Sequence, residues 1–64
     1  MKVVLRNPRR ELELEGDRTV GRLLDELGLA RESHLVICNG TLVPGDARVG
    51  GDDVVEVRPV ISGG

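Results

Sequence analysis

Apolar and polar residues alternate along the first part of the chain. Residues 11–15, Glu-Leu-Glu-Leu-Glu, alternate strictly, which is typical of a strand with one buried face, and the short apolar run in residues 2–6, Lys-Val-Val-Leu-Arg, also predicts a strand. The connection 7–10 begins Asn7-Pro8, a pair that favours a turn. We therefore predict an antiparallel hairpin. The expected pairs are Val3 with Leu14 and Leu5 with Leu12 on the apolar face, and Lys2 with Glu15 and Arg6 with Glu11 on the polar face.

From residue 19 onward, the spacing of the apolar residues changes to that of a helix. Thr19 is a suitable N-cap, and Gly28 lies where a left-handed residue ends a helix. Leu29 can fold back onto the last turn, as in a Schellman ending. The apolar positions between the caps follow the i, i+3, i+4, i+7 spacing; they are Val20, Leu23, Leu24 and Leu27. The pattern predicts one amphipathic helix of about nine residues, or about 13 Å.

Three further strands are expected after the helix. Residues 35–38 are a continuous apolar run, and Asn39-Gly40 is a strong hairpin signal before the short strand 41–43. Residues 54–58 form the last strand. Because Pro59 has no N–H to donate, we expect ladder pairing to end there.

This order of elements predicts an α+β roll, with a mixed sheet of four to five strands and one helix packed on one face. Residues 45–53 are expected to be a loop whose lone Val49 closes the bottom of the core. We expect one domain over residues 1–59 and a flexible tail over residues 60–64.

The amino-acid composition excludes several classes of function. The 64 residues include no Phe, Tyr or Trp, and the net charge is -2. Without stacking aromatics or a basic patch, direct nucleic-acid binding is not expected. No apolar run approaches membrane-spanning length, and the first strand starts too early for a signal peptide. The single cysteine, Cys38, has no disulfide partner in this sequence, which indicates the reducing cytoplasm.

Candidate chemistry concentrates at the end of the sequence, Gly63-Gly64. Glycine lacks a Cβ, so it lets the backbone and a carboxylate pass close to another protein's active site. No catalytic pair or metal site is expected elsewhere. Cys38 is expected to point inward with Val36 as a small hydrophobe, and His34 to be a solvated residue before a strand.

One face of the predicted sheet remains open to partners. If Val36 points inward, Leu35 and Ile37 point outward on the face away from the helix. Val4 and Val54 would share that face, and the group is either a docking patch or ordinary scattered apolar surface. The charged residues that could rim such a patch, or be ordinary surface, are Arg6, Arg48 and Arg58.

The chain resembles the ubiquitin-like sulfur carriers of the ThiS and MoaD type over essentially its whole length. Three segments carry the resemblance: LDELGL at 24–29, VICNGTLV at 36–43 and GDDVVEVRPVISGG at 51–64. It implies the β-grasp (ubiquitin-like) fold. It further implies that an E1-like enzyme adenylates the Gly64 carboxylate with ATP, that a thiocarboxylate forms, and that Gly63 is a required neighbour. The tail positions expected to be recognised are Gly63, Ser62, Ile61 and Val60; those expected to dock the partner are Ile37, Leu35, Val54 and Arg58.

The resemblance implies a protein cosubstrate rather than an enzyme, with no bound cofactor. Its expected partners are the E1-like enzyme, a sulfurtransferase or desulfurase as sulfur donor, and a sulfur-accepting synthase or thiolase in tRNA thiolation, molybdopterin or thiamine synthesis. Two alternatives stay open. One is a ubiquitin-like modifier joined through Gly64 to lysines of other proteins. The other is a β-grasp interaction subunit that binds without covalent chemistry.

Overall fold

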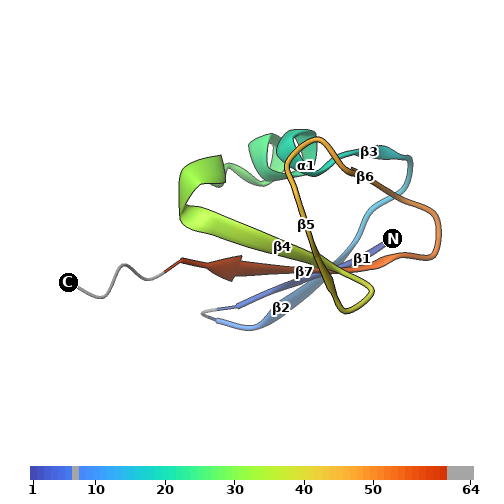
Figure 1. Cartoon of the computed structure of the whole chain (residues 1–64). Coiled ribbons are helices and arrows are strands. Elements are labelled where there is room, and N and C mark those ends of the chain that lie inside the picture. The colour runs from blue at the N-terminus through green and yellow to red at the C-terminus, as the bar shows by residue number, and fades with distance from the viewer. Residues whose placement is uncertain (7, 61–64) are drawn as a thin grey trace.

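The computed structural model describes residues 1–6 and 8–60 and contains one α-helix and a five-stranded sheet (Figure 1). The elements are β1 (Lys2–Leu5), β2 (Arg10–Glu13), β3 (Arg18–Thr19), α1 (Val20–Leu27), the 3₁₀ helix η1 (Arg31–Ser33), β4 (His34–Cys38), β5 (Thr41–Val43), β6 (Arg48–Val49) and β7 (Val54–Pro59). The strand order is β2-β1-β7-β4-β5. Only the β1–β7 pair in this sheet is parallel, so the predicted mixed-sheet β-grasp roll is confirmed.

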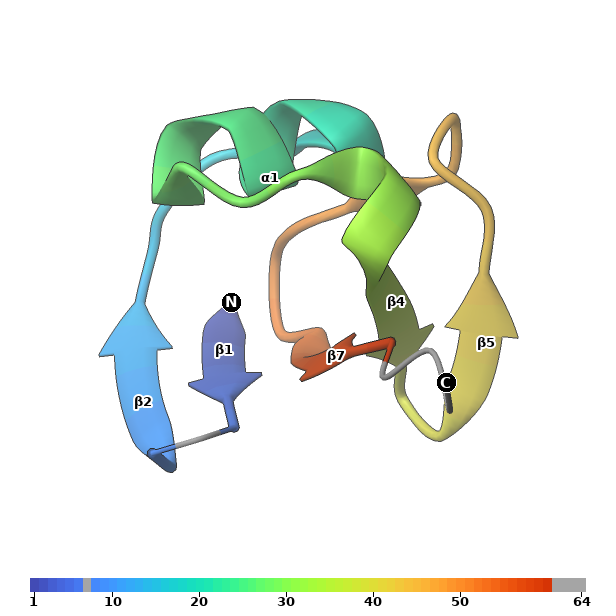
Figure 2. The ribbon, with the colours of Figure 1, turned by 90° about the vertical axis from the view of Figure 1, so that its left-hand side faces the viewer.

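Helix α1 crosses one side of the curved sheet, and the core lies between these two layers (Figure 2). The core consists of aliphatic side chains from both layers, as expected without aromatic residues. Its buried members are Met1, Val3, Val20, Leu23, Leu24, Val36, Val49, Val55 and Val57. Among the described residues, no helix is long and apolar enough to cross a membrane.

The predicted register of the first hairpin is wrong by two residues. Val3 lies opposite Leu12, not Leu14, and Lys2 lies opposite Glu13. A shift of two keeps every side chain on its predicted face, because the side-chain period of a strand is two. The observed register also brings Met1 into the core, where its amino group donates a 2.6 Å hydrogen bond to the Leu14 carbonyl oxygen.

The helix ends follow the prediction, although α1 has eight residues rather than nine. The backbone N–H of Arg22 donates to the Thr19 hydroxyl oxygen at 3.2 Å, which caps the first turn. Gly28 adopts φ 72°, and the Leu29 N–H donates to the Leu24 carbonyl oxygen at 2.9 Å. These contacts form the predicted Schellman ending.

The Asn39-Gly40 turn also matches the prediction and makes a further connection. Both residues have positive φ, 50° and 85°, as the tight hairpin turn between β4 and β5 requires. The Asn39 side chain donates to an Asp53 carboxylate oxygen at 2.9 Å and accepts the Val54 N–H at 2.9 Å. This turn is thereby tied to the start of β7.

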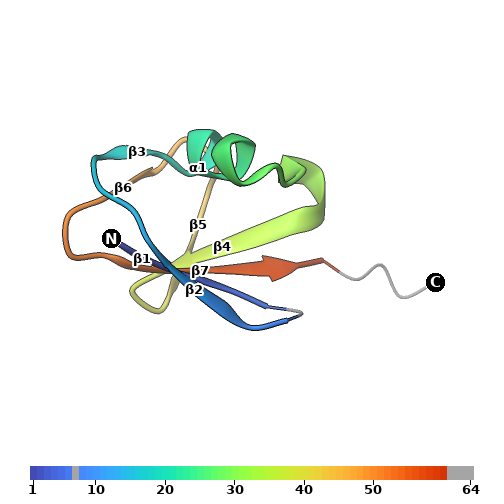
Figure 3. The same cartoon turned by 180° about the vertical axis from the view of Figure 1, so that it is seen from behind.

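The segment 45–53, predicted to be loop, contains the short strand β6. It pairs with β3 beside the start of α1, at the end of the molecule opposite the end of β7 (Figure 3). Val49 is buried, as predicted. A two-residue strand has no measurable periodicity, so the pattern could not show it. Gly50 fits here because a Cβ would come within 2.8 Å of the Asp17 Cα.

Candidate functional site

The point where β7 leaves the sheet is the base of the predicted tail. Strand β7 pairs with β1 on one side and β4 on the other, and Pro59 lies opposite His34. The Val60 N–H donates a 2.8 Å hydrogen bond to the Ser33 carbonyl oxygen. Pairing on the β4 side therefore continues one residue beyond Pro59, contrary to the prediction.

The direction of backbone groups explains why Pro59 is tolerated. Successive residues of a strand direct their N–H groups to opposite neighbours. Val60 donates toward β4, so the position of Pro59 faces the side of β1, whose pairing with β7 ends at Leu5 and Val57. The N–H that Pro59 lacks would have no acceptor on β1, so its absence removes no hydrogen bond from the sheet.

The residues predicted to react or to be recognised beyond this point lie outside the described part of the chain. They are Ile61, Ser62, Gly63 and Gly64, and their roles stay predictions. Val60, the remaining predicted tail residue, is described and exposed. Its backbone N–H continues the hydrogen bonding of β7 by one residue, and the predicted tail over residues 60–64 stays a prediction.

The predicted docking residues occur on the sheet face opposite α1. Leu35 and Val54 are 46% and 48% exposed, and Ile37 is half-buried beside Leu42, which is 61% exposed. Val4 belongs to this face by alternation, but it is buried. The outward direction of Leu35 and Ile37 follows from Val36, which lies between them and is buried in the core.

A charged cluster lies beside these apolar side chains. One carboxylate oxygen of Glu56 contacts Arg6 Nε at 2.9 Å and Arg58 Nε at 3.0 Å. The Arg6 hydrogen bond, with the positive charge of Arg58, holds the pKa of Glu56 below its ordinary value. The predicted Arg6–Glu11 pairing is not formed, since Glu11 instead contacts Lys2 at 3.1 Å and Arg9 at 3.0 Å.

The two other residues that the sequence predicted at the rim, Arg58 and Arg48, lie in different sheets. Arg58 lies opposite Leu35 on β7, within the apolar group. Arg48 lies opposite Thr19 in the small β3–β6 sheet, so it cannot rim this face. Sequence position alone could not distinguish the two arginines.

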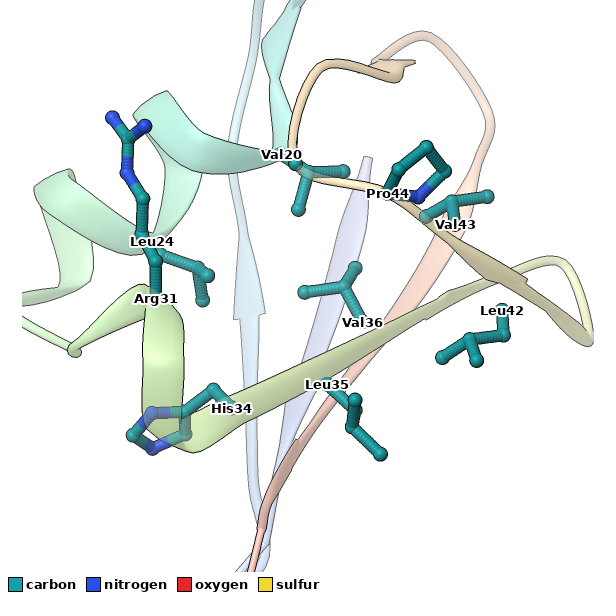
Figure 4. Close-up of a pocket in the computed structure, with 10 residues that line it drawn as sticks. Val20, Leu24, Arg31, His34, Leu35, Val36, Leu42, Val43 and Pro44 are labelled. Carbon is teal, nitrogen blue, oxygen red and sulfur yellow. The ribbon is translucent and has the colours of Figure 1, made fainter.

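An open apolar groove of about 510 Å³ lies between α1 and the β4–β5 hairpin (Figure 4). Val20, Leu24, Val36 and Val43 are among its lining residues. His34 lines it too; this residue begins β4, is half-buried, and has Nδ1 2.8 Å from the Ala30 carbonyl oxygen. The expectation of a solvated histidine is therefore only partly correct. The described side chains of the groove bring no nucleophile to this ring.

Cys38 packs against the core, as predicted from its alternation with Val36. Burial raises the pKa of its thiol, and the nearby Asp53 carboxylate adds to this effect. A raised pKa keeps the thiol protonated and weakly reactive. This environment favours the interpretation of Cys38 as a small hydrophobe.

The fold and the exit of β7 define a small ubiquitin-like β-grasp protein. The sequence model of the family described as small archaeal modifier protein 2 matches residues 1–61. The chain is also 40% identical over 65 residues to a protein named sulfur carrier protein TtuB from Thermus thermophilus, and that match covers 100% of both chains. The chain therefore belongs to the small archaeal modifier protein 2 family and is of the ThiS and MoaD sulfur-carrier type.

Proposed function

We propose that the chain is a sulfur carrier whose Gly64 carboxylate is activated and converted to a thiocarboxylate. The observation that carries this proposal is the likeness to a named sulfur carrier over the whole chain, a match whose span includes positions 63 and 64. The family match alone would carry it less far, because it ends at residue 61. We propose a carrier that another enzyme acts upon, in the cytoplasm, with no cofactor of its own.

The proposed chemistry proceeds in two steps at the Gly64 carboxyl group, the first at an oxygen atom and the second at the carbon atom. An oxygen of the Gly64 carboxylate attacks the α-phosphorus of ATP on an E1-like enzyme, and pyrophosphate leaves. Sulfide, released when a thiol reduces the persulfide of a sulfurtransferase or desulfurase, then adds to the acyl carbon, and AMP leaves with the oxygen that joined it to that carbon. The product is a thiocarboxylate that a synthase or thiolase consumes. We favour tRNA thiolation or molybdopterin synthesis over the thiamine route as its destination.

The geometry of the folded part of the chain, here called the head, supports a carrier that presents its Gly64 carboxylate to another enzyme. The backbone of β7 is held on both sides as far as Val57, and on the β4 side as far as Val60. Residues 61–64 would span about 14 Å if fully extended, which suits entry into a narrow active site while the head stays outside. Small residues at the reacting end let the backbone approach the nucleotide closely.

We further propose that the activating enzyme docks on the sheet face opposite α1. Ile37, Leu35 and Val54 would supply apolar contact, and Arg58 would supply the polar edge. Leu42, which the sequence did not single out, adjoins Ile37 and would extend the contact. The pairing of Arg58 with Glu56 leaves one carboxylate shared by two guanidinium groups, so the cluster keeps a net positive charge for an acidic partner surface.

A second candidate function is conjugation to lysines of other proteins. The description of the matching family as modifier proteins favours it. The same acyl-adenylate serves both functions, since a lysine amine and a sulfide differ only as nucleophiles.

Intact-mass analysis tests the carrier proposal. The purified chain is incubated with ATP, an E1-like enzyme from the same cell and a sulfide source. A gain equal to one oxygen-to-sulfur exchange, absent from a variant that lacks Gly64, is expected. Failure to form an adenylate or a thiocarboxylate would contradict the proposal. Chain mass found instead on lysines of cellular proteins would favour the modifier function.

A further inference from the structure

The sequence contains a single lysine, Lys2, among nine basic residues; the other eight are arginines. An activated Gly64 carboxyl is an electrophile, and a deprotonated lysine amine is the side-chain nucleophile that attacks it to form a stable amide. Arginine does not lose its proton in proteins, so it is not such a nucleophile. The composition therefore confines amide formation between copies of this chain to two amines, Lys2 Nζ and the Met1 amino group.

The structure distinguishes these two amines. Met1 is only 5% exposed and belongs to the core, and its amino group is bonded to the Leu14 carbonyl oxygen at 2.6 Å. An incoming carboxyl cannot reach it without opening the β1–β2 hairpin. The Lys2 side chain is 47% exposed, and its contact is a surface ion pair with Glu11 at 3.1 Å. Such surface ion pairs contribute little to stability, so the Lys2 amine can leave Glu11 and face solvent.

The position of Lys2 separates it from the end of its own chain. Lys2 lies opposite Val54, where β7 begins, whereas the predicted reacting residues follow the other end of β7 (Figure 1). The path back along β7 is about 17 Å at the usual rise of a strand. Residues 61–64 span about 14 Å at most, and a reversal of direction uses part of that length. The carboxyl that reaches Lys2 must come from a second copy.

We propose that Lys2 is the site at which this chain is itself acylated by the Gly64 carboxyl of another copy. The inference rests on the proposed activation of Gly64. The neutral Lys2 amine attacks the acyl carbon of the adenylate; a C–N bond forms, the C–O bond to AMP breaks, and AMP leaves. The proton lost from nitrogen goes to solvent. The product is an isopeptide-linked dimer, extendable because the acceptor copy keeps its own Gly64.

The test uses the full chain with ATP and the E1-like enzyme, without sulfide. Wild type is compared with Lys2→Arg, which keeps the positive charge beside Glu11, and with Glu11→Gln, which keeps the amine but removes its partner. A covalent dimer is expected in wild type and in E11Q, joined from Gly64 to Lys2 by peptide mapping, and is expected to be lost in K2R.

Two readouts keep failure of this inference distinct from failure of the proposed function. The initial burst of pyrophosphate release and trapping of the activated carboxyl by hydroxylamine report activation alone, and both should be equal in wild type and K2R. Activation without a dimer overturns the Lys2 site. A dimer that persists in K2R, a linkage at Met1, a cyclised monomer, or loss of the dimer in E11Q also overturns it. Absence of pyrophosphate release contradicts the proposed activation itself.

Discussion

The backbone N–H of Val60 donates a 2.8 Å hydrogen bond to the carbonyl oxygen of Ser33, one residue beyond Pro59. This bond joins the end of β7 to the residue just before β4. The course of the backbone up to Val60 is therefore set by the sheet rather than by the proline alone. The bond provides a local means of testing whether that direction matters for activation.

Replacing Val60 by proline removes this donor. We expect Val60→Pro to lower the free energy of unfolding by about 1 kcal/mol, the usual net value of one such bond. Activation is expected to fall further: kcat/KM for adenylation should drop by about tenfold or more, because misdirection of a reacting group is costly. Val60→Ala keeps the N–H and is the matched control. Equal kcat/KM in V60P and V60A would refute the importance of the bond.

Ile37 tests the proposed docking face. Ile37→Asp should weaken binding to the activating enzyme by at least about 1.4 kcal/mol, or tenfold in Kd. It should lower stability by only about 1 kcal/mol, because the side chain is half-buried and Arg6 and Arg58 lie near the new carboxylate. Calorimetric titration and thermal unfolding measure the two effects.

Val36→Asp is the control for this experiment, since Val36 is the adjacent inward residue. A carboxylate in the core should cost about 4 kcal/mol or more and unfold the domain. Comparable destabilisation by the two substitutions would show that Ile37 is part of the core and not of a docking surface.

Glu56 makes stability depend on pH. Its pKa is lowered in the folded protein, first by the Arg6 hydrogen bond. A lowered folded-state pKa contributes stability that is fully present above the unfolded value, ordinarily 4.5, and that is lost as pH falls through the folded value. Thermal unfolding followed from neutral pH to below pH 4.5 should therefore show a decline that is shallower in Glu56→Gln. Parallel profiles for the two proteins would contradict this assignment.

Gly50 tests the packing of the β6 segment, which the sequence pattern did not show. Gly50→Ala places a methyl group within 2.8 Å of the Asp17 Cα, so backbone must move, at about 1–3 kcal/mol. Gly45→Ala is the control in the same segment, because a methyl there meets nothing within 4 Å, and it should change stability by less than about 0.5 kcal/mol. Chemical denaturation of both variants measures the difference, and equal stabilities would contradict the close approach.

The parts of the fold that were predictable are those with local signals. Thr19 and Gly28 mark the ends of the helix by their own side-chain and backbone preferences, and Asn39-Gly40 marks a turn in the same way. The register of the first hairpin was not predictable, because a shift of two residues leaves both faces unchanged. The observed choice depends on placing Met1 against Leu14, which no local pattern signals.

The charged part of the candidate site was missed for a related reason. The partner of Arg6 is Glu56, fifty positions away in sequence and brought near by the parallel β1–β7 pairing. The sequence pattern supplied only the nearby Glu11 as an alternative. The apolar part was predictable, since alternation about Val36 placed Leu35 and Ile37 on the open face.

The most direct test of the sulfur-carrier proposal is the intact mass of the chain purified from its own cells under non-reducing, mild conditions. We predict a population heavier by one oxygen-to-sulfur exchange, with the added mass confined to the peptide that contains Gly63-Gly64. This population should disappear when the E1-like enzyme is deleted. A chain that carries only a carboxylate in cells with active sulfur transfer would contradict the proposal.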